Sequence, residues 1–188
     1  MTDETRLWLV RHAPVDGPRG VIHAPDAPAD LRDSARLAAL RATLPRGPAL
    51  CSPARRTVET ARALALAATT EPALREQSFG CWTGRRHHEI EAALGAAAYR
   101  EFWRAPARNR PPEGESFVDQ VARVADRLAR LPAGDVVLVV HSGTVRAALA
   151  IALEIPPESA LRFVIDPLSL TRIDRLEESW RVVMVNLR

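Results

Sequence analysis

The chain has 188 residues, 47% hydrophobic and 26% charged, with a formal net charge of +3. These values are typical of a globular chain in water and favour a single domain over residues 1–188. No stretch approaches 18 uncharged apolar residues, which excludes a transmembrane helix, and two cysteines are too few for a disulfide framework. The first ten residues lack a basic start followed by an apolar core, so we expect no export signal and a cytoplasmic protein.

The positive charge does not point to nucleic acid. All 26 basic residues are arginine, and they alternate with acidic residues along the predicted helices. A nucleic-acid-binding protein would concentrate basic residues on one face. We therefore expect neither nucleic acid nor a membrane as partner, and a coding bias explains the lack of lysine.

The first predicted element is a buried strand. Residues 7–10 form a short apolar run, which ends in Arg11 and His12. Runs of this length near a chain start favour a strand. Two groups that are costly to bury stand at its end, either because the strand reaches the surface or because it delivers them to a cleft. A Pro/Gly-rich loop follows.

The next elements alternate between helix and strand. Their limits come from hydrophobic spacing and from proline and glycine breaks. In chain order, we predict a helix over 31–44 that Pro45 stops, a short strand ending at Ser52, a helix over 55–67, a short extended piece over 71–76, a loop over 77–84, and one or two helices over 86–104.

The second half of the chain repeats the alternation. Beyond a proline-broken loop, Ser116 is a good N-cap, with Asp119 in the capping-box position of a helix that reaches 131. We then predict a turn at Gly134 and Asp135, a strand over 136–140, a helix over 144–153, and two late strands over 169–174 and 180–187. This order predicts an α/β domain with a largely parallel sheet, closed by antiparallel strands near the C-terminus.

Polar side chains follow three of the predicted strands. In open α/β sheets, ligands bind at the carboxyl ends of the strands. Guanidinium groups match phosphate oxygens in pairs, and backbone amides at a helix start add further donors. The sequence therefore predicts a phosphate pocket at one sheet edge, built from Arg11 and His12, from Ser52 with Arg55 and Arg56, and from His141 with Ser142 and Gly143.

Each of these residues also has a simpler explanation. A histidine at a strand end is commonly a hydrogen-bonded structural group, and an arginine at a helix start is commonly solvated. A metal site is the other alternative for two histidines. The sequence contains no His-Glu-x-x-His motif, no paired cysteine spacing and no acidic residue beside His12 or His141. We therefore expect no metal and no cofactor.

Five segments, in order along most of the chain, resemble motifs of the histidine phosphatase superfamily in its phosphoglycerate-mutase-like branch. They are LVRHA, SPARRTVETA, LREQSFGCWTG, EGESFVDQVARV and VVHSGTVRAAL. In the second motif the matching arginine is Arg56, not Arg55, and in the third Glu76 matches the family's acidic proton donor. The RPPEGES segment and the short loop after His12 are most similar to alpha-ribazole phosphatases.

The resemblance implies a three-layer α/β/α, phosphoglycerate-mutase-like fold with a mainly parallel central sheet. It also implies a metal-independent phosphomonoester hydrolase that forms a phosphohistidine. The substrate would be a small phosphorylated metabolite, with alpha-ribazole 5′-phosphate as one candidate. His12 would attack phosphorus while its other ring N–H donates to a backbone carbonyl, and Glu76 would protonate the leaving oxygen. The expected phosphate-binding groups are Arg11, Arg56, His141, Ser142 and Gly143.

Two alternative functions stay open. Ala13 replaces the family's glycine, and the threonine and asparagine common in mutases are absent from 14–16. The missing asparagine favours a hydrolase over a phosphoglycerate-type mutase, and both departures motivate a non-catalytic phospholigand-binding module.

Several residues and the oligomeric state are left open. A homodimer is neither indicated nor excluded. Arg85, Arg86, His87 and His88 are either a solvated helix start or substrate contacts, and His23 receives no role. We expect Cys51 and Cys81 to be small buried residues.

Overall fold

A computed structural model describes residues 4–188; residues 1–3, the beginning of the stretch without an export signal, lie outside the described residues. Within that range the strands are β1 (Thr5–Arg11), β2 (Ala49–Cys51), β3 (Thr69–Thr70), β4 (Gly134–Val140), β5 (Leu170–Arg175) and β6 (Trp180–Leu187). The α-helices are α1 (Ser34–Thr43), α2 (Arg55–Ala63), α3 (His87–Leu94), α4 (Ala96–Arg104), α5 (Phe117–Ala129), α6 (Ser142–Ala152) and α7 (Pro157–Ala160). Two 3-10 helices are η1 (Pro72–Leu74) and η2 (Gly80–Trp82).

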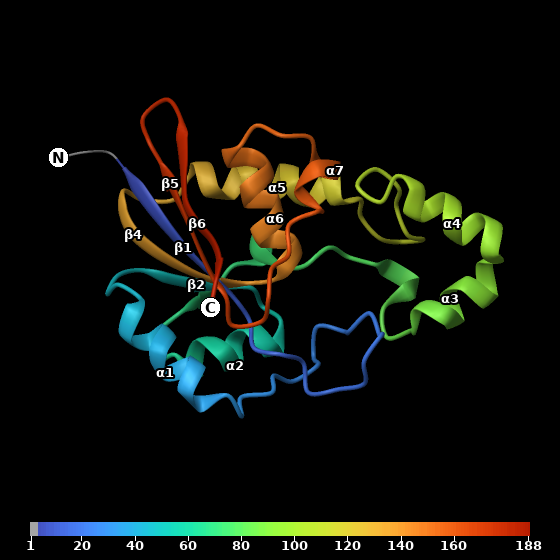
Figure 1. The fold of residues 1–188 in the computed structure, drawn as a ribbon, viewed down its shortest axis with the longest axis horizontal. Helices are drawn as coiled ribbons and strands as arrows, with labels where there is room; N and C mark the ends of the chain where they lie inside the picture. The colour runs from blue at the N-terminus through green and yellow to red at the C-terminus, as the bar shows by residue number, and fades with distance from the viewer. Residues whose placement is uncertain (1–3) are drawn as a thin grey trace.

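The strands form one sheet in the order β3-β2-β4-β1-β5-β6. The pairs from β3 to β1 are parallel, and β5 and β6 close the sheet in antiparallel fashion. Helices α5 and α6 cover one face and α1 and α2 the other, while α3 and α4 extend to one side (Figure 1). The predicted mainly parallel sheet between two helical layers, with two antiparallel C-terminal strands, is confirmed.

Alternation along the central strands divides the core between the two faces. In β1, Leu7 and Leu9 pack into the cluster completed by α5 and α6, whereas Val10 joins the cluster beneath α1 and α2. In β4, Leu138 and Val139 alternate in the same way. Both strands are therefore buried on both sides, and only their ends can carry polar groups at low cost. No helix in the part of the chain that the structure describes is long and apolar enough to cross a bilayer.

The piece predicted to be extended over 71–76 forms the 3-10 helix η1 instead. Pro72 occupies its first position, where its fixed φ suits a helical turn. The Glu71 side chain caps that turn by accepting a hydrogen bond from the backbone N–H of Ala73 at 3.0 Å. The prediction was wrong because this local capping outweighs the short apolar pattern.

Two helix ends differ from their predicted positions because of local interactions at the ends. Helix α1 begins after the predicted 31 because the Asp33 side chain accepts a hydrogen bond from the backbone N–H of Arg36 at 3.0 Å. Helix α2 ends before the predicted 67 because Ala65 adopts a φ of 57°. Ala65, in this left-handed conformation, turns the chain toward β3. The sequence pattern did not predict the short strand β3.

Three further comparisons concern β4, α6 and the α3–α4 stretch. Gly134 and Asp135 were predicted as a turn, but they begin β4 because they pair with the first residues of β1. Helix α6 begins at Ser142 rather than Thr144, directly after the strand. The stretch predicted as one or two helices contains two, α3 and α4, which Gly95 separates with a φ of 83°.

Candidate active site

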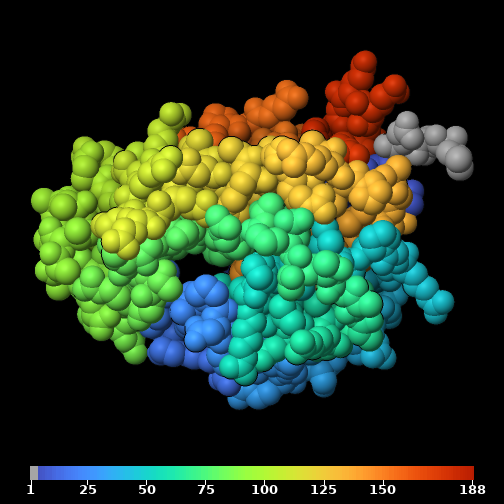
Figure 2. Space-filling model, turned by 180° about the vertical axis from the view of Figure 1, so that it is seen from behind, coloured from blue at the N-terminus to red at the C-terminus, as the bar shows by residue number. Residues whose placement is uncertain are grey.

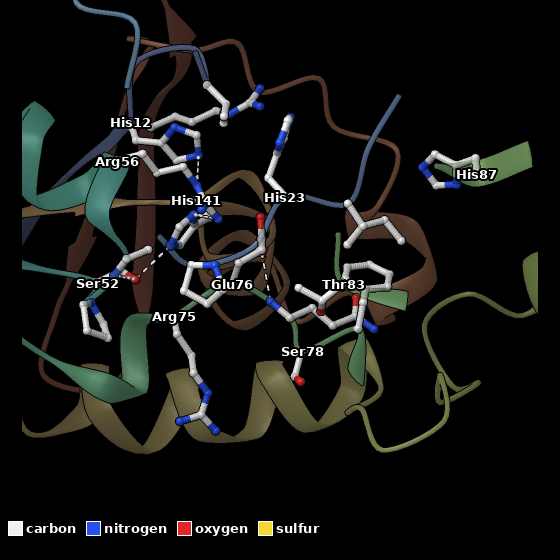
Figure 3. Close-up of a pocket in the computed structure, with 18 of the residues that line it drawn as sticks. His12, His23, Ser52, Arg56, Arg75, Glu76, Ser78, Thr83, His87 and His141 are labelled. Carbon is white, nitrogen blue, oxygen red and sulfur yellow. Dashed lines mark hydrogen bonds between the residues drawn. The ribbon is translucent and has the colours of Figure 1, made fainter. Parts of the chain in front are cut away.

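A cavity of about 530 Å³ opens at the carboxyl ends of β1, β2 and β4. The space-filling view shows the molecule hollowed between the loop that follows β1 and the segment that leads into α3 (Figure 2). His12, Arg56 and His141 lie at one end of the cavity and His87 at the other, with Glu76 and Thr83 between them (Figure 3). Its volume lies in the range of sites that bind small molecules.

His12 follows β1 directly and is 4% exposed. Its Nδ1 lies 2.5 Å from the carbonyl oxygen of Ala13, which can only accept, so Nδ1 carries the proton. The lone pair is then on Nε2, to which the Nε–H of Arg56 donates at 3.3 Å. The predicted hydrogen bond to a backbone carbonyl is confirmed, and it fixes the tautomer.

Burial keeps His12 neutral. Loss of water, followed by the nearby charges of His141 and Arg56, holds the pKa of His12 well below its ordinary value. A neutral imidazole with its lone pair at a fixed ring nitrogen is a competent nucleophile.

His141 lies beside His12 because of the strand register. Arg11 of β1 pairs with Val140 of β4, so the next residue of each strand is a histidine, and the ring centroids are 5.1 Å apart. His141 Nδ1 accepts from Arg56 Nη2 at 3.4 Å, so Nε2 carries the proton and donates to the Ser52 hydroxyl oxygen at 2.8 Å. Burial, then the charges of Arg56 and Arg11, holds the pKa of His141 well below its ordinary value.

Arg11 and Arg56 bring positive charge without an acidic partner. Neither makes an ion pair within residues 4–188, and Nε of Arg11 is buried without an acceptor there. Burial lowers the pKa of both guanidinium groups, and the charge of Glu76 partly offsets this. Arg56 is 6% exposed and sits in the first turn of α2, where the helix dipole disfavours a cation. The cavity end is therefore short of negative charge.

Glu76 enters the cavity from the irregular segment between η1 and η2. One carboxylate oxygen accepts from the backbone N–H of Gln77 and from Nε2 of Gln120, both at 3.2 Å. The other accepts from the backbone N–H of Gly143 at 3.3 Å and the Ser142 hydroxyl at 3.5 Å. Glu76 is half-buried and lines the same cavity as His12.

The start of α6 faces Glu76 rather than the two histidines. Ser142 and Gly143 line an adjoining hollow of about 250 Å³, which Glu76 also borders. A Cβ on Gly143 would lie 2.1 Å from Oε1 of Glu76, so a side chain there would displace the carboxylate from this position. The predicted contact of Ser142 and Gly143 with phosphate stays a prediction, while their contact with the carboxylate is observed.

The outer part of the cavity is mainly apolar and was not anticipated from the sequence. It is lined by Val15, Ile22, His23, Phe79, Thr83, His87 and Trp103. Of the four residues left open at 85–88, His87 is the one that lines the cavity among the described residues. Spacing alone could not identify this group, because its members come from separate loops and helices.

Trp103 is held by other aromatic side chains. It packs edge-to-face against Phe102 at a centroid distance of 5.1 Å, and Phe102 packs in the same way on the buried Trp82 at 4.5 Å. On the other side, Nδ1 of His87 lies 3.0 Å from the hydroxyl of Tyr99. Trp103 therefore belongs to an aromatic cluster that reaches the core through Trp82.

The two cysteines differ in burial. Cys51 is buried at the end of β2, as predicted, but Cys81 is exposed. The prediction for Cys81 was wrong because η2 turns Trp82 inward instead.

The described residues offer no obvious metal ligands. Residues 4–188 contain no group of three or more His, Cys, Asp or Glu side chains that could hold a metal ion. At the strand ends, the positive charge comes from Arg11 and Arg56 instead.

Comparisons with known proteins agree on one family, although the relatives' names carry two different substrates. Residues 7–188 match the family profile described as histidine phosphatase superfamily (branch 1). The adenosylcobalamin/alpha-ribazole phosphatase of Salmonella typhimurium is 28% identical over 97% of this chain and 96% of its own length. The glucosyl-3-phosphoglycerate phosphatase of Mycolicibacterium vanbaalenii is 34% identical over 82% and 76%. The crystal structure of a putative alpha-ribazole-5′-P phosphatase from Escherichia coli superposes with a TM-score of 0.86 at 25% identity, covering 98% of this chain and 97% of that one.

Proposed function

Because the chain belongs to the histidine phosphatase superfamily (branch 1), we propose that it hydrolyses small phosphate monoesters through a phosphohistidine on His12. The family resemblance of the five motifs and the phosphoglycerate-mutase-like fold are confirmed. Its named relatives are phosphatases, and the chain is a phosphatase of this family. The intermediate, the role of each residue and the substrate are our proposals.

In the first step, Nε2 of His12 attacks phosphorus and the bond from phosphorus to the leaving oxygen breaks. Glu76 gives its proton to that oxygen, so the product leaves as an alcohol. Arg11, Arg56 and His141 bind the three equatorial oxygens, where negative charge is spread in the transition state.

In the second step, water takes the place of the alcohol. Glu76, now a carboxylate, accepts a proton from water while the water oxygen attacks phosphorus. The bond from phosphorus to His12 breaks, inorganic phosphate forms, and both side chains return to their starting states.

One observation carries this proposal: the tautomer of His12. The Ala13 carbonyl requires the proton on Nδ1, which leaves the Nε2 lone pair facing Arg56, a guanidinium group without an acidic partner among the described residues. A purely phosphate-binding module would need the arginines but no neutral histidine and no carboxylate across the cavity. The arrangement therefore supports covalent transfer over binding alone.

The outer cavity supports a substrate with a flat ring. Ile22, Phe79 and Trp103 offer apolar surface at the mouth. Alpha-ribazole 5′-phosphate carries a benzimidazole ring on its ribose, whereas a glucosyl phosphoglycerate carries hydroxyl groups and a carboxylate. We therefore propose alpha-ribazole 5′-phosphate, or a phosphate ester of the same shape, as the substrate. The free thiols of Cys51 and Cys81 support a cytoplasmic setting.

Trapping the intermediate tests the proposed chemistry. The protein is mixed with substrate in the presence of a strong chelator, quenched without acid and analysed by peptide mass spectrometry. We expect phosphate on the peptide that contains His12. Label on the peptide that contains His141, or activity that disappears with the chelator and returns with divalent ions, would contradict the proposal.

Substrate identity needs a matched comparison. Alpha-ribazole 5′-phosphate and ribose 5-phosphate share a primary alcohol as leaving group and differ in the ring. We expect a higher kcat/KM for the ring-bearing ester than for ribose 5-phosphate or glucosyl-3-phosphoglycerate. A preference for glucosyl-3-phosphoglycerate would replace the proposed substrate while leaving the reaction type intact.

A further inference from the structure

Glu76 lies on a segment that has no regular structure of its own. Residues 75–79 lie between η1 and η2 and make no helix or strand. A proton donor has to stay within hydrogen-bond reach of the leaving oxygen. Contacts from outside residues 75–79 must therefore hold Glu76 in place, and these contacts come from α5 and the residues just before it.

An ion pair between Glu115, just before α5, and Arg123, in the middle of α5, holds the backbone on both sides of Glu76. Arg123 donates to the carbonyl oxygens of Ala73 at 2.7 Å and of Glu76 at 3.1 Å. It also pairs with Glu115 at 2.6 Å, and the two side chains are 17% and 15% exposed. The same Glu115 carboxylate accepts from the backbone N–H of Ser78 at 2.9 Å.

The backbone of Glu115 adds two more contacts to this segment. Its N–H donates to the carbonyl oxygen of Ser78 at 2.9 Å, and its carbonyl accepts from the Gln77 side chain at 2.8 Å. The residues that follow Glu76 are thus held by hydrogen bonds to Glu115. The Ser116 cap, which exchanges hydrogen bonds with Asp119, anchors Glu115 at the helix start.

Gln120, one turn further along α5, contacts the carboxylate itself. Its side chain is fully buried, and Nε2 donates to Oε1 of Glu76 at 3.2 Å and to the carbonyl oxygen of Arg75 at 3.3 Å. Its Oε1 is buried without a donor in the described residues. Both Oε1 of Gln120 and Oε1 of Glu76 lie within 2.9 Å of where a Cβ of Gly143 would stand. The amide therefore offers a donor to the ionised carboxylate and a vacant acceptor beside it.

We propose that Gln120 and the Glu115–Arg123 pair are the positioning residues of the proton donor. The pair fixes the backbone of Glu76, and Gln120 orients its carboxyl group. The hydrogen bond from Nε2 of Gln120 to Oε1 of Glu76 holds the carboxyl group in place while its proton goes to the leaving oxygen. This inference rests on the proposed function, because it assigns a purpose only if Glu76 donates a proton.

Gln120→Met tests the assignment with little change in volume. If Gln120 positions the acid, hydrolysis of an alkyl phosphate should fall by up to about 100-fold. Hydrolysis of p-nitrophenyl phosphate should change little, because nitrophenolate leaves without a proton. In a Glu76→Gln background, the same substitution should leave the alkyl-to-aryl ratio unchanged, since the two residues act as one unit.

A second pair of variants separates positioning from stability. Arg123→Met and Arg127→Met each remove an arginine of α5 that pairs with a glutamate. Arg127 pairs with Glu71, the cap of η1, at 2.5 Å and makes no hydrogen bond to residues 75–79 among the described residues. We expect both to lower Tm and only Arg123→Met to change the alkyl-to-aryl ratio.

The outcomes distinguish this inference from the proposed function. Equal losses on both substrates for Gln120→Met, or equal ratio changes for the two arginine variants, would overturn the positioning role while the phosphatase assignment stands. Arg123→Lys should recover part of the ratio, because an ammonium can reach only some of these acceptors. If the unaltered protein hydrolyses neither ester, the proposed function fails and this inference fails with it.

Discussion

The two ends of the cavity are built in opposite ways. At the inner end, His12 and His141 are buried, stand at the ends of adjacent parallel strands and share Arg56 as a hydrogen-bond partner. At the outer end, Trp103 is 38% exposed and His87 belongs to the α3–α4 hairpin, outside the sheet layers. The inner end provides charge in a dry setting and the outer end provides apolar surface.

We assign the reaction to the inner end of the cavity and the choice of substrate to the outer end. Strand ends in a close-packed sheet hold side chains within narrow limits, as a reaction at phosphorus demands. The hairpin of α3 and α4 lies outside the sheet layers, so substitutions on its surface need not disturb the sheet. We therefore expect changes at the inner end to affect every substrate and changes at the outer end to affect only some.

The largest effect is expected for His12→Ala. If His12 is the proposed nucleophile, no phosphoenzyme can form without it, so activity on both alkyl and nitrophenyl phosphates should fall by at least about 10,000-fold. Steady-state kinetics would measure the loss. His88→Ala is the matched control, because His88 is exposed and does not line the cavity. Residual activity above about 1% of the starting rate would show that His12 is not the nucleophile.

Glu76→Gln should come next and should depend on the leaving group. General acid catalysis contributes roughly 100- to 10,000-fold, so hydrolysis of a sugar phosphate should fall by that amount. Nitrophenyl phosphate should lose clearly less. The measurement is kcat/KM on both esters, and equal losses would mean that Glu76 binds or orients rather than donates.

Trp103→Ala should lower activity only on substrates that contact the outer end of the cavity. Stacking of one base on an aromatic ring is worth about 1–3 kcal/mol, so kcat/KM for a ring-bearing phosphate should fall roughly 10- to 100-fold. Ribose 5-phosphate should be hydrolysed as before. Leu94→Ala is the control, because Leu94 is 39% exposed on the same hairpin and does not line the cavity. A uniform loss on both esters would place Trp103 in the support of the inner end.

The smallest effect concerns stability against pH. Folding lowers the pKa of His12 and His141, so below about pH 6.5 the unfolded chain binds more protons than the folded one. Stability should therefore fall as pH falls through that range, with each histidine adding up to about 1.4 kcal/mol per pH unit. Urea unfolding at several pH values would measure the slope.

A double variant identifies the source of that slope. His12→Gln combined with His141→Gln should flatten the decline between pH 6.5 and 5. His88→Gln should leave it as it is. An unchanged slope in the double variant would contradict the neutral state that the nucleophile requires.

Hydrolase and mutase can be separated with 3-phosphoglycerate. Because residues 14–16 lack the mutase-like threonine and asparagine, we expect phosphate release to be faster than conversion to the 2-isomer. Isomer formation that outpaces release would favour the mutase instead.

The sequence by itself determined most of the sheet and the edge at which its polar side chains gather. Apolar runs that end in Arg11 with His12, and in His141, place these groups at strand ends, since a buried strand tolerates polar residues only there. Five motifs in order were specific enough to identify the family and to choose Arg56 over Arg55. These signals are local, because each motif is one short run of neighbouring residues.

Only the tertiary structure decided which groups meet. Register brings His12 beside His141, and the Ala13 carbonyl sets the tautomer. Helix α5 holds Glu76, which no spacing rule connects to Gln120. The outer wall likewise depends on the placement of loops and the α3–α4 hairpin. Contacts between distant segments depend on the packing of the whole chain, and a pattern read along one segment does not contain them.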